Sequence, residues 1–377
     1  MEKLARLGRT VTIVAVTFPA VAALLAAGSA DTLKTQIDQR LRLRDDQAAA
    51  GLIERHLERQ PADAVMLYNA ACVQCRLGEI DLGAAFLLRA IKAGFADVSH
   101  ARRDPDLRPL HGHPVFRAIV DARDAADETL ARRQMQAWRR QLGEAPYRYE
   151  VDTTRRIITI SALDETADAS VHRLLETHTD HLQQTLFPST PSYVLVLIPT
   201  RDDAASLLTR PHVRGLYNHR RRELVTFGHP RALRHELAHA LHHGHMDDLG
   251  QEHPLWIQEG LASLYETYDV DDDGTARFGP NDRHEHVKTL AINGWLLSWS
   301  DLAALKPEAL QSEAFRVYPQ LRSIFRFFAD QGKLESWYRA YTDSFDTDET
   351  GITAIATVFD RPITEVEAAW RRWLDSD

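Results

Sequence analysis

Two histidines and a glutamate stand in a spacing that could hold a metal ion. His235, Glu236 and His239 form the pattern His-Glu-x-x-His inside an amphipathic stretch that predicts a helix. Residues i and i+4 lie on one helix face, so both imidazoles can reach a single zinc ion at ~2.0–2.1 Å. Glu236 then lies beside the ion, where its carboxylate can hold and deprotonate a water molecule as a general base. The pattern predicts a zinc site suited to hydrolysis.

The third zinc ligand decides whether the motif is genuine, because a catalytic zinc ion usually takes three protein ligands and leaves a fourth position for water. His245 is one candidate, since it nearly fits the metzincin spacing HExxHxxGxxH. The fit fails in two places. His242 stands where that spacing needs a helix-breaking glycine, and no methionine follows Met246 to form the expected turn.

Glu259 is the other candidate, and we prefer it. It lies twenty residues beyond His239, in the segment Pro-Leu-Trp-Ile-Gln-Glu-Gly-Leu-Ala. The stretch from Gly244 to Pro254 is rich in glycine, aspartate and proline, so it can reverse the chain. A helix after that reversal would bring the Glu259 carboxylate to the zinc ion.

The run His-Glu-Leu-Ala-His, followed by Pro-x-Trp-x-x-Glu-Gly-x-Ala, resembles the gluzincin branch of the zincin superfamily, the peptidase MA-like group. The resemblance covers roughly residues 147–341. It implies zinc as the cofactor, His235, His239 and Glu259 as its ligands, and Glu236 as the base. It also implies a peptide or protein as the substrate. No GxMEN motif of the aminopeptidases precedes His235, which leans toward an endopeptidase and leaves exopeptidase action open.

A further donor is needed for the oxyanion that forms during peptide hydrolysis. Tyr318 lies 59 residues after Glu259 and opens an apolar helical stretch, as the tyrosine of aminopeptidase relatives does. We therefore expect Tyr318 to be the donor. His284 and His286, which we expect in an exposed loop, are alternatives, and Tyr217 is a further one.

The segment departs from the thermolysin pattern at one point. Four residues after the glutamate ligand, where that pattern has an acid that orients a histidine, this chain has Ser263. Glu266 could substitute, but the sequence does not place it.

The elements that must position these residues begin with a predicted hairpin, residues 147–151 and 157–161, which alternates apolar and polar residues. A helix over 166–186, a buried strand over 193–198 and a strand over 223–227 follow, and the pattern after Pro230 is almost wholly helical to Trp373. A small sheet followed by helices predicts an α+β fold, here a zincin-like catalytic domain over 147–377 with C-terminal helices.

Residues 31–124 predict an all-α region. Helices over 46–61, 64–77 and 81–93, separated by short turns, resemble tetratricopeptide repeats, which could bind a protein partner. An ordinary helical bundle is the alternative. Cys72 and Cys75 lie three apart on one predicted helix face, and a lone pair of this kind favours buried core residues over a redox or metal site. A charged helical linker is expected over 125–146.

The first thirty residues predict an export signal. Lys3, Arg6 and Arg9 precede an apolar run over 11–27, and small residues at 28–30 suit cleavage. We expect a periplasmic or secreted bacterial protein without stable membrane insertion after cleavage. An uncleaved anchor is the alternative, although the run is short for a membrane span.

Composition narrows the function further. Lys and Arg total 45 against 54 Asp and Glu, a net charge of −9, which argues against nucleic acid as a partner. We expect a zinc-dependent peptidase that uses Glu236 to activate water. Two alternatives remain: a catalytically inactive zincin-fold scaffold that binds partner proteins through its helical repeats, and a structural zinc site closed by His245.

Overall fold

The computed structural model describes residues 33–95, 98–189, 192–207, 214–271 and 273–376. The predicted signal over 1–30 lies outside these ranges. Within them, no helix combines the length and the apolar character that a membrane span requires. The chain divides into two compact units, Met1–Asp121 and Ala122–Asp377.

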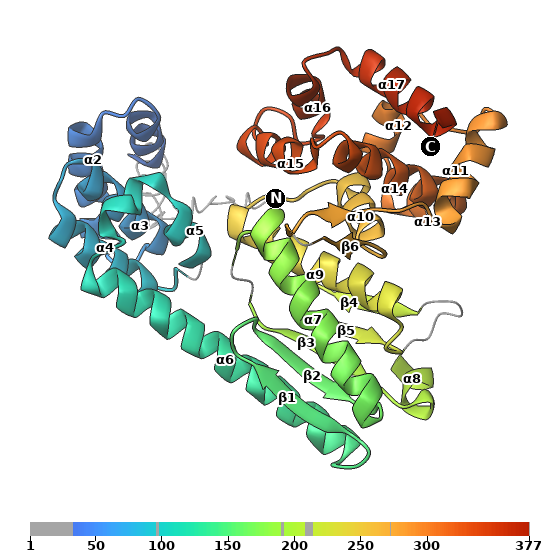
Figure 1. Cartoon of the computed structure of the whole chain (residues 1–377). Helices are drawn as coiled ribbons and strands as arrows, with labels where there is room; N and C mark the ends of the chain where they lie inside the picture. The colour runs from blue at the N-terminus through green and yellow to red at the C-terminus, as the bar shows by residue number, and fades with distance from the viewer. Residues whose placement is uncertain (1–32, 96–97, 190–191, 208–213, 272, 377) are drawn as a thin grey trace, which may run out of the picture. The chain divides into compact units, whose positions relative to one another are not determined.

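The N-terminal unit is helical (Figure 1). Its elements are a helix over 33–42, α2 (Asp46–Arg59), α3 (Ala64–Arg76), α4 (Ile80–Lys92), α5 (Val98–Arg103), the 3-10 helix η1 (Pro105–Leu110) and the start of α6 (Pro114–Leu142). The side chain of Asp63 caps α3 by accepting from Met66 N, which satisfies one of the free N–H groups at a helix start. Helices therefore form close to the three predicted ranges, and the resemblance to a repeat family stays a prediction.

The two cysteines are packed inside this unit. Both thiols are free and buried, and the Sγ atom of Cys72 lies 3.3 Å from a carboxylate oxygen of Asp104. A Cβ atom on Gly83 would lie only 2.7 Å from the Sγ atom of Cys75, so α4 passes very close to that thiol. Burial raises the pKa of Cys75 to about 11, which keeps it protonated and unreactive at neutral pH. These features favour a packing role.

The second unit is built on a five-stranded mixed sheet in the order β1-β2-β3-β5-β4. The strands are β1 (Arg148–Asp152), β2 (Ile157–Ser161), β3 (Val194–Ile198), β4 (Gly215–Asn218) and β5 (Glu223–Thr226). The central strands β2, β3 and β5 run parallel, and the two edge strands pair antiparallel to their neighbours. Strands β2 and β3 are buried along their whole length, as expected for parallel strands covered on both faces.

Helices cover both faces of this sheet (Figure 1). Ala131, Met135 and Trp138 of α6 pack against one face, on Ile158 and Ile160 among others. The other face packs against α7 (Glu165–Thr185) and α9 (Pro230–Leu249). The short α8 (Arg201–Leu207) follows β3. The sheet therefore serves as a rigid base under α9, the helix that carries the His-Glu-x-x-His motif.

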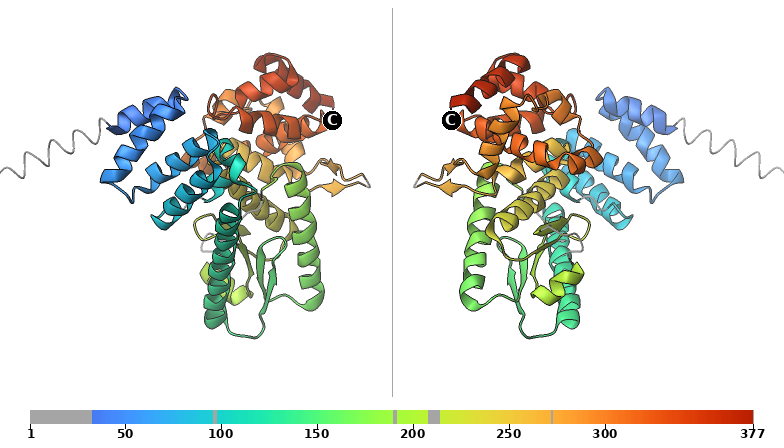
Figure 2. Two further views of the ribbon diagram at one scale, coloured as in Figure 1. Left: turned by 90° about the vertical axis from the view of Figure 1, so that its left-hand side faces the viewer. Right: turned by 90° about the vertical axis from the view of Figure 1, so that its right-hand side faces the viewer.

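The rest of the unit is helical, apart from the small hairpin β6 (Asp269–Val270) and β7 (Ala276–Arg277). Its helices are α10 (Leu255–Leu264), α11 (Asp282–Ile292), α12 (Trp299–Ala303), α13 (Pro307–Ser312), α14 (Ala314–Asp330), α15 (Leu334–Asp343), α16 (Ile352–Phe359) and α17 (Ile363–Ser376). Figure 2 shows the later helices, in orange and red, gathered at one end of the sheet. This arrangement is an α+β fold, in agreement with the expected class.

Three details differ from the sequence-based expectations. The charged helix expected to begin at 125 begins at Pro114, so α6 runs without a break from the first unit into the second. Strand β4 was not predicted. The hairpin β6–β7 interrupts a region expected to be helical.

Candidate metal centre

Helix α9 presents the two motif histidines on the side away from the sheet. Pro230 occupies its first turn, where the missing N–H costs nothing, and Gly250 ends it in the left-handed conformation with φ of 64°. Leu233, Leu237 and Leu241 are buried against the sheet and lock the rotation of the helix. The helix continues through Gly244 to Leu249, so the chain reversal is shorter than the expected stretch from Gly244 to Pro254.

Helix α10 brings Glu259 to face these histidines. It begins directly after Pro254 and packs between α9 and α14. A Cβ atom on Gly260 would lie 2.1 Å from the ring of Phe325 in α14, a distance no real contact allows. Glycine at 260 therefore permits the close approach of the two helices, and the adjacent Glu259 is held over α9.

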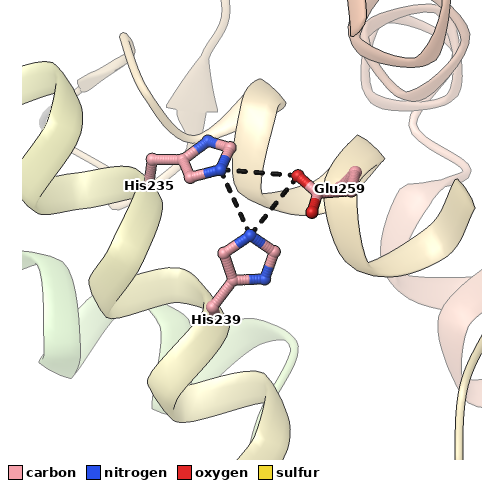
Figure 3. A group of neighbouring side chains, drawn as sticks. All are labelled: His235, His239 and Glu259. Atoms are coloured by element: carbon pink, nitrogen blue, oxygen red, sulfur yellow. Dashed lines mark hydrogen bonds and ion pairs between the residues drawn. The ribbon is translucent and has the colours of Figure 1, made fainter. Parts of the chain in front are cut away.

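The side chains of His235, His239 and Glu259 converge on one point (Figure 3). The Nε2 atoms of the two histidines are 3.1 Å apart, and they lie 3.5 and 3.4 Å from the Oε2 atom of Glu259. Ligand atoms at zinc–ligand distances of ~2.05 Å in a tetrahedral arrangement lie about 3.3 Å apart. The three measured separations bracket that value, so the donor triangle has the size that a zinc ion requires.

The charges in the triangle also suit a cation. The buried Oε2 atom of Glu259 lies within ion-pair distance of both histidines and makes no hydrogen bond of normal geometry among the described residues. Burial acts to raise the pKa of Glu259, but the two histidines outweigh it and hold that pKa well below its usual range. Burial acts to lower the pKa of His235, but Glu259 and Glu266 outweigh it and raise that pKa to about 10. The donor set, two imidazoles and a carboxylate, fits zinc.

Glu266 orients the first histidine from behind. Its Oε1 atom lies 3.0 Å from Nδ1 of His235, which leaves Nε2 directed into the donor triangle. Arg231 and Arg283 each bind the same carboxylate, at 3.3 and 2.9 Å. Ser263 is fully buried and its Oγ atom has no partner among the described residues. Glu266 therefore makes the contact with His235 that Ser263 does not make. The sequence had named Glu266 as the residue that could take this place.

Glu236 lies against the edge strand β4. Its Oε2 atom accepts a hydrogen bond of 2.9 Å from the backbone N–H of Tyr217. A Cβ atom on Gly215 would lie 2.8 Å from Cγ of Glu236, so a larger residue at 215 would displace the carboxylate. The edge strand therefore fixes the side chain that is the candidate general base.

Tyr318 lines the same cavity as His235 and Glu236, a space of about 610 Å³. Its ring centroid lies 6.5 Å from that of His235, and the guanidinium of Arg283 lies 5.4 Å from the centre of the tyrosine ring. Burial and the nearby Glu259 carboxylate raise the pKa of Tyr318, so the hydroxyl keeps its proton at neutral pH. It is placed to donate a hydrogen bond beside the donor triangle.

The residues considered as alternatives for the third metal ligand and for the oxyanion donor make other contacts. His245 stays on the continuous helix α9, and its Nδ1 atom lies 2.6 Å from Oγ of Ser189. The expectation that His284 and His286 lie in an exposed loop was wrong. Both belong to α11, and His284 is buried against Arg326. The ring of Tyr217 lies near His243, and the group that binds Glu236 is its backbone N–H.

Sequence reasoning missed the part played by β4 and by the arginines around Glu266. Tyr217 contributes through its backbone N–H, which leaves no trace in the side-chain pattern. Arg231, two residues after the helix N-cap, and Arg283 had no motif to single them out. The triplet Gly215-Leu216-Tyr217 before the motif was the available signal for a short edge strand.

Comparisons with known proteins yield no match to a protein-family model, a curated protein or a solved structure.

Proposed function

We propose that the chain is a zinc-dependent hydrolase of peptide bonds, with His235, His239 and Glu259 as zinc ligands and Glu236 as the general base. The observation that carries this proposal is the size of the donor triangle, 3.1 to 3.5 Å on each side. A triangle closed by two histidines and one glutamate leaves a fourth position for water, unlike a fully protein-ligated structural site.

A zinc ion bound there would polarise the substrate carbonyl and lower the pKa of water, which is the chemistry the cofactor supplies. Glu236 accepts a proton from the attacking water and then gives it to the amine that leaves. The N–H of Tyr217 holds the carboxylate in position throughout. Tyr318 donates its hydroxyl proton in a hydrogen bond to the oxyanion. Peptide C–N bond cleavage thereby needs no group beyond these residues, water and the cofactor.

The edge strand supports a polypeptide as the substrate. Among the described strands, β4 pairs with β5 alone, and it borders Glu236 through Gly215. The N–H of Tyr217 is taken by Glu236, and an extended chain can add to the remaining backbone groups of this sheet edge. Such a chain would pass the candidate base with its peptide bonds aligned, as cleavage of a polypeptide requires.

The test is zinc content measured together with hydrolysis of an unfolded protein substrate, in the purified full chain and two variants. Glu259→Ala should lose most of its zinc and its activity. Glu236→Gln should retain zinc and lose activity by at least about 100-fold. Glu252→Ala, which changes an exposed glutamate in the same region, is the matched control.

Equal activity in Glu236→Gln and the parent chain would overturn the mechanism. Undiminished zinc in Glu259→Ala would overturn the ligand set. Zinc bound at one ion per chain with no turnover of any peptide would favour the inactive scaffold whose partner binds at the helical repeats.

A further inference from the structure

The cavity beside the donor triangle is bordered by three arginines. Arg214, Arg231 and Arg283 all line it, from the residue before β4, from α9 and from α11. A guanidinium group presents its N–H donors in a planar fork that matches a carboxylate. A cavity of about 610 Å³ could hold a side chain or a chain end beside the reacting bond.

The carboxylates of the cavity do not satisfy all three arginines. Arg231 and Arg283 both bind Glu266, and Arg231 also binds Asp282 at 3.0 Å. Arg214 is exposed and forms no ion pair with any described residue. With a divalent cation on the donor triangle, the cation and the three arginines would bring five positive charges against the four negative charges of Glu236, Glu259, Glu266 and Asp282. The cavity with its cation bound would therefore attract an anion. Arg214 has the most N–H donors that no carboxylate of the cavity already engages.

The backbone places Arg214 next to the candidate base. The carbonyl of Arg214 accepts a hydrogen bond of 3.1 Å from Oγ1 of Thr226, which ties this residue to β5. The next residue, Gly215, is the one that packs against Cγ of Glu236. A substrate whose scissile bond lies at Glu236 would thus have its neighbouring groups within the range of the Arg214 side chain.

We propose that this cavity binds a carboxylate of the substrate and that Arg214 determines this specificity. The inference rests on the proposed function and names the class of substrate: peptides that carry a carboxylate close to the scissile bond. That carboxylate is either an acidic side chain or the α-carboxylate of the chain end. The two sources share one chemistry, and the experiment separates them.

A substitution at Asp282 should affect the binding of acidic peptides in the opposite direction to the loss of Arg214. Its side chain is 70% exposed, and it occupies a donor of Arg231 that faces the same cavity. Replacing Asp282 by asparagine removes a negative charge from the cavity and releases that donor. Acidic peptides should then bind more tightly, whereas the loss of Arg214 should weaken them.

The experiment measures the binding of fluorescent peptides to the full-length Glu236→Gln variant, by anisotropy, with and without added zinc. One pair of C-terminally amidated peptides differs only in glutamate or glutamine near the centre. A second pair has a neutral sequence and ends in a free acid or an amide. We expect one acidic member to bind about tenfold more tightly than its neutral partner, and the pair that responds identifies the source of the carboxylate.

In the Glu236→Gln background, Arg214→Gln should abolish most of the preference for the acidic peptide. Arg214→Glu should reverse that preference, and Asp282→Asn should increase it. Arg220→Gln, an exposed arginine just beyond the other end of β4, should leave it unchanged. The inference is overturned if neither acidic peptide is preferred, or if Arg214→Gln and Arg220→Gln behave alike. Hydrolysis of the same peptides by the parent chain tests the proposed function separately, because the binding preference does not depend on turnover.

Discussion

The Nδ1 atom of His235 lies 3.0 Å from Oε1 of Glu266, a residue seven positions beyond Glu259. Because Nδ1 is engaged there, the lone pair of Nε2 is left for a metal. A single carboxylate thus links the candidate zinc ligand to Arg231 and Arg283. Glu266 should influence metal binding without touching the metal.

Glu266→Gln should weaken zinc binding by about 10- to 100-fold, because the orienting charge is lost and two guanidinium groups lose their shared partner. Competition with a chromophoric chelator measures the zinc Kd. Glu252→Gln, an exposed site, should leave the Kd unchanged. An unaltered Kd in Glu266→Gln would show that the contact is merely structural.

Tyr318→Phe should lower kcat by about 100-fold or more with little change in KM, because the lost hydroxyl acts mainly on the oxyanion. The ring that packs beside Arg283 is retained, so folding should be preserved. Steady-state kinetics and zinc content measure both quantities. A rise in KM with unchanged kcat would assign Tyr318 to substrate binding instead.

Gly260→Ala should destabilise the second unit by about 1–3 kcal/mol, because the added methyl group meets the fully buried ring of Phe325. Urea unfolding measures the change. Gly279→Ala is the control, since a Cβ atom there meets nothing within 4 Å. Adding Phe325→Leu should cost less in the Gly260→Ala background than in the parent chain, and strictly additive costs would contradict the proposed clash.

Acid should destabilise the protein through His178. This side chain is buried, with Nδ1 2.9 Å from the hydroxyl of Tyr268 and Nε2 3.0 Å from the carbonyl of Arg234. Burial is the main reason that its pKa falls to about 3. The unfolded chain therefore binds the proton first, and stability is complete above pH ~6.5 and is lost progressively as the pH falls toward 3.

Between pH 7.5 and 5, the parent chain should lose about 2 kcal/mol more unfolding free energy than His178→Gln, which cannot take up this proton. Urea unfolding of chelator-treated protein at both pH values tests this and removes any contribution from metal binding. Identical losses in the two proteins would show that His178 is already protonated in the folded state at pH 5.

Much of the framework could be predicted from local pattern. The alternating segment Ile157–Ser161 and the apolar run Val194–Ile198 both predicted strands, and both are buried central strands. The helix that carries the His-Glu-x-x-His motif could be predicted because its two histidines share one helix face. The helix of Glu259 could be predicted because a chain reversal separates it from that motif. The strand Gly215–Asn218 was missed because it is short, begins with glycine and depends on pairing with β5.

The position of Glu266 could not be predicted for a specific reason. Helix α10 ends at Leu264, with Tyr265 as its C-cap, so Glu266 lies beyond the helix. The 3.6-residue period that relates Ser263 to Glu259 no longer applies there. Only the path of the chain after α10 brings the carboxylate back behind His235, and that path depends on tertiary packing.

The close packing of Gly215 on Glu236 also bears on how distant relatives of this chain could be recognised. A five-residue motif occurs by chance in many sequences, whereas a glycine 21 positions before the glutamate adds an independent requirement imposed by space rather than by catalysis. Homologues that keep the base should keep this glycine even where the surrounding strand has diverged. Its replacement by a bulkier residue would mark lineages in which the base has moved or chemistry has been abandoned.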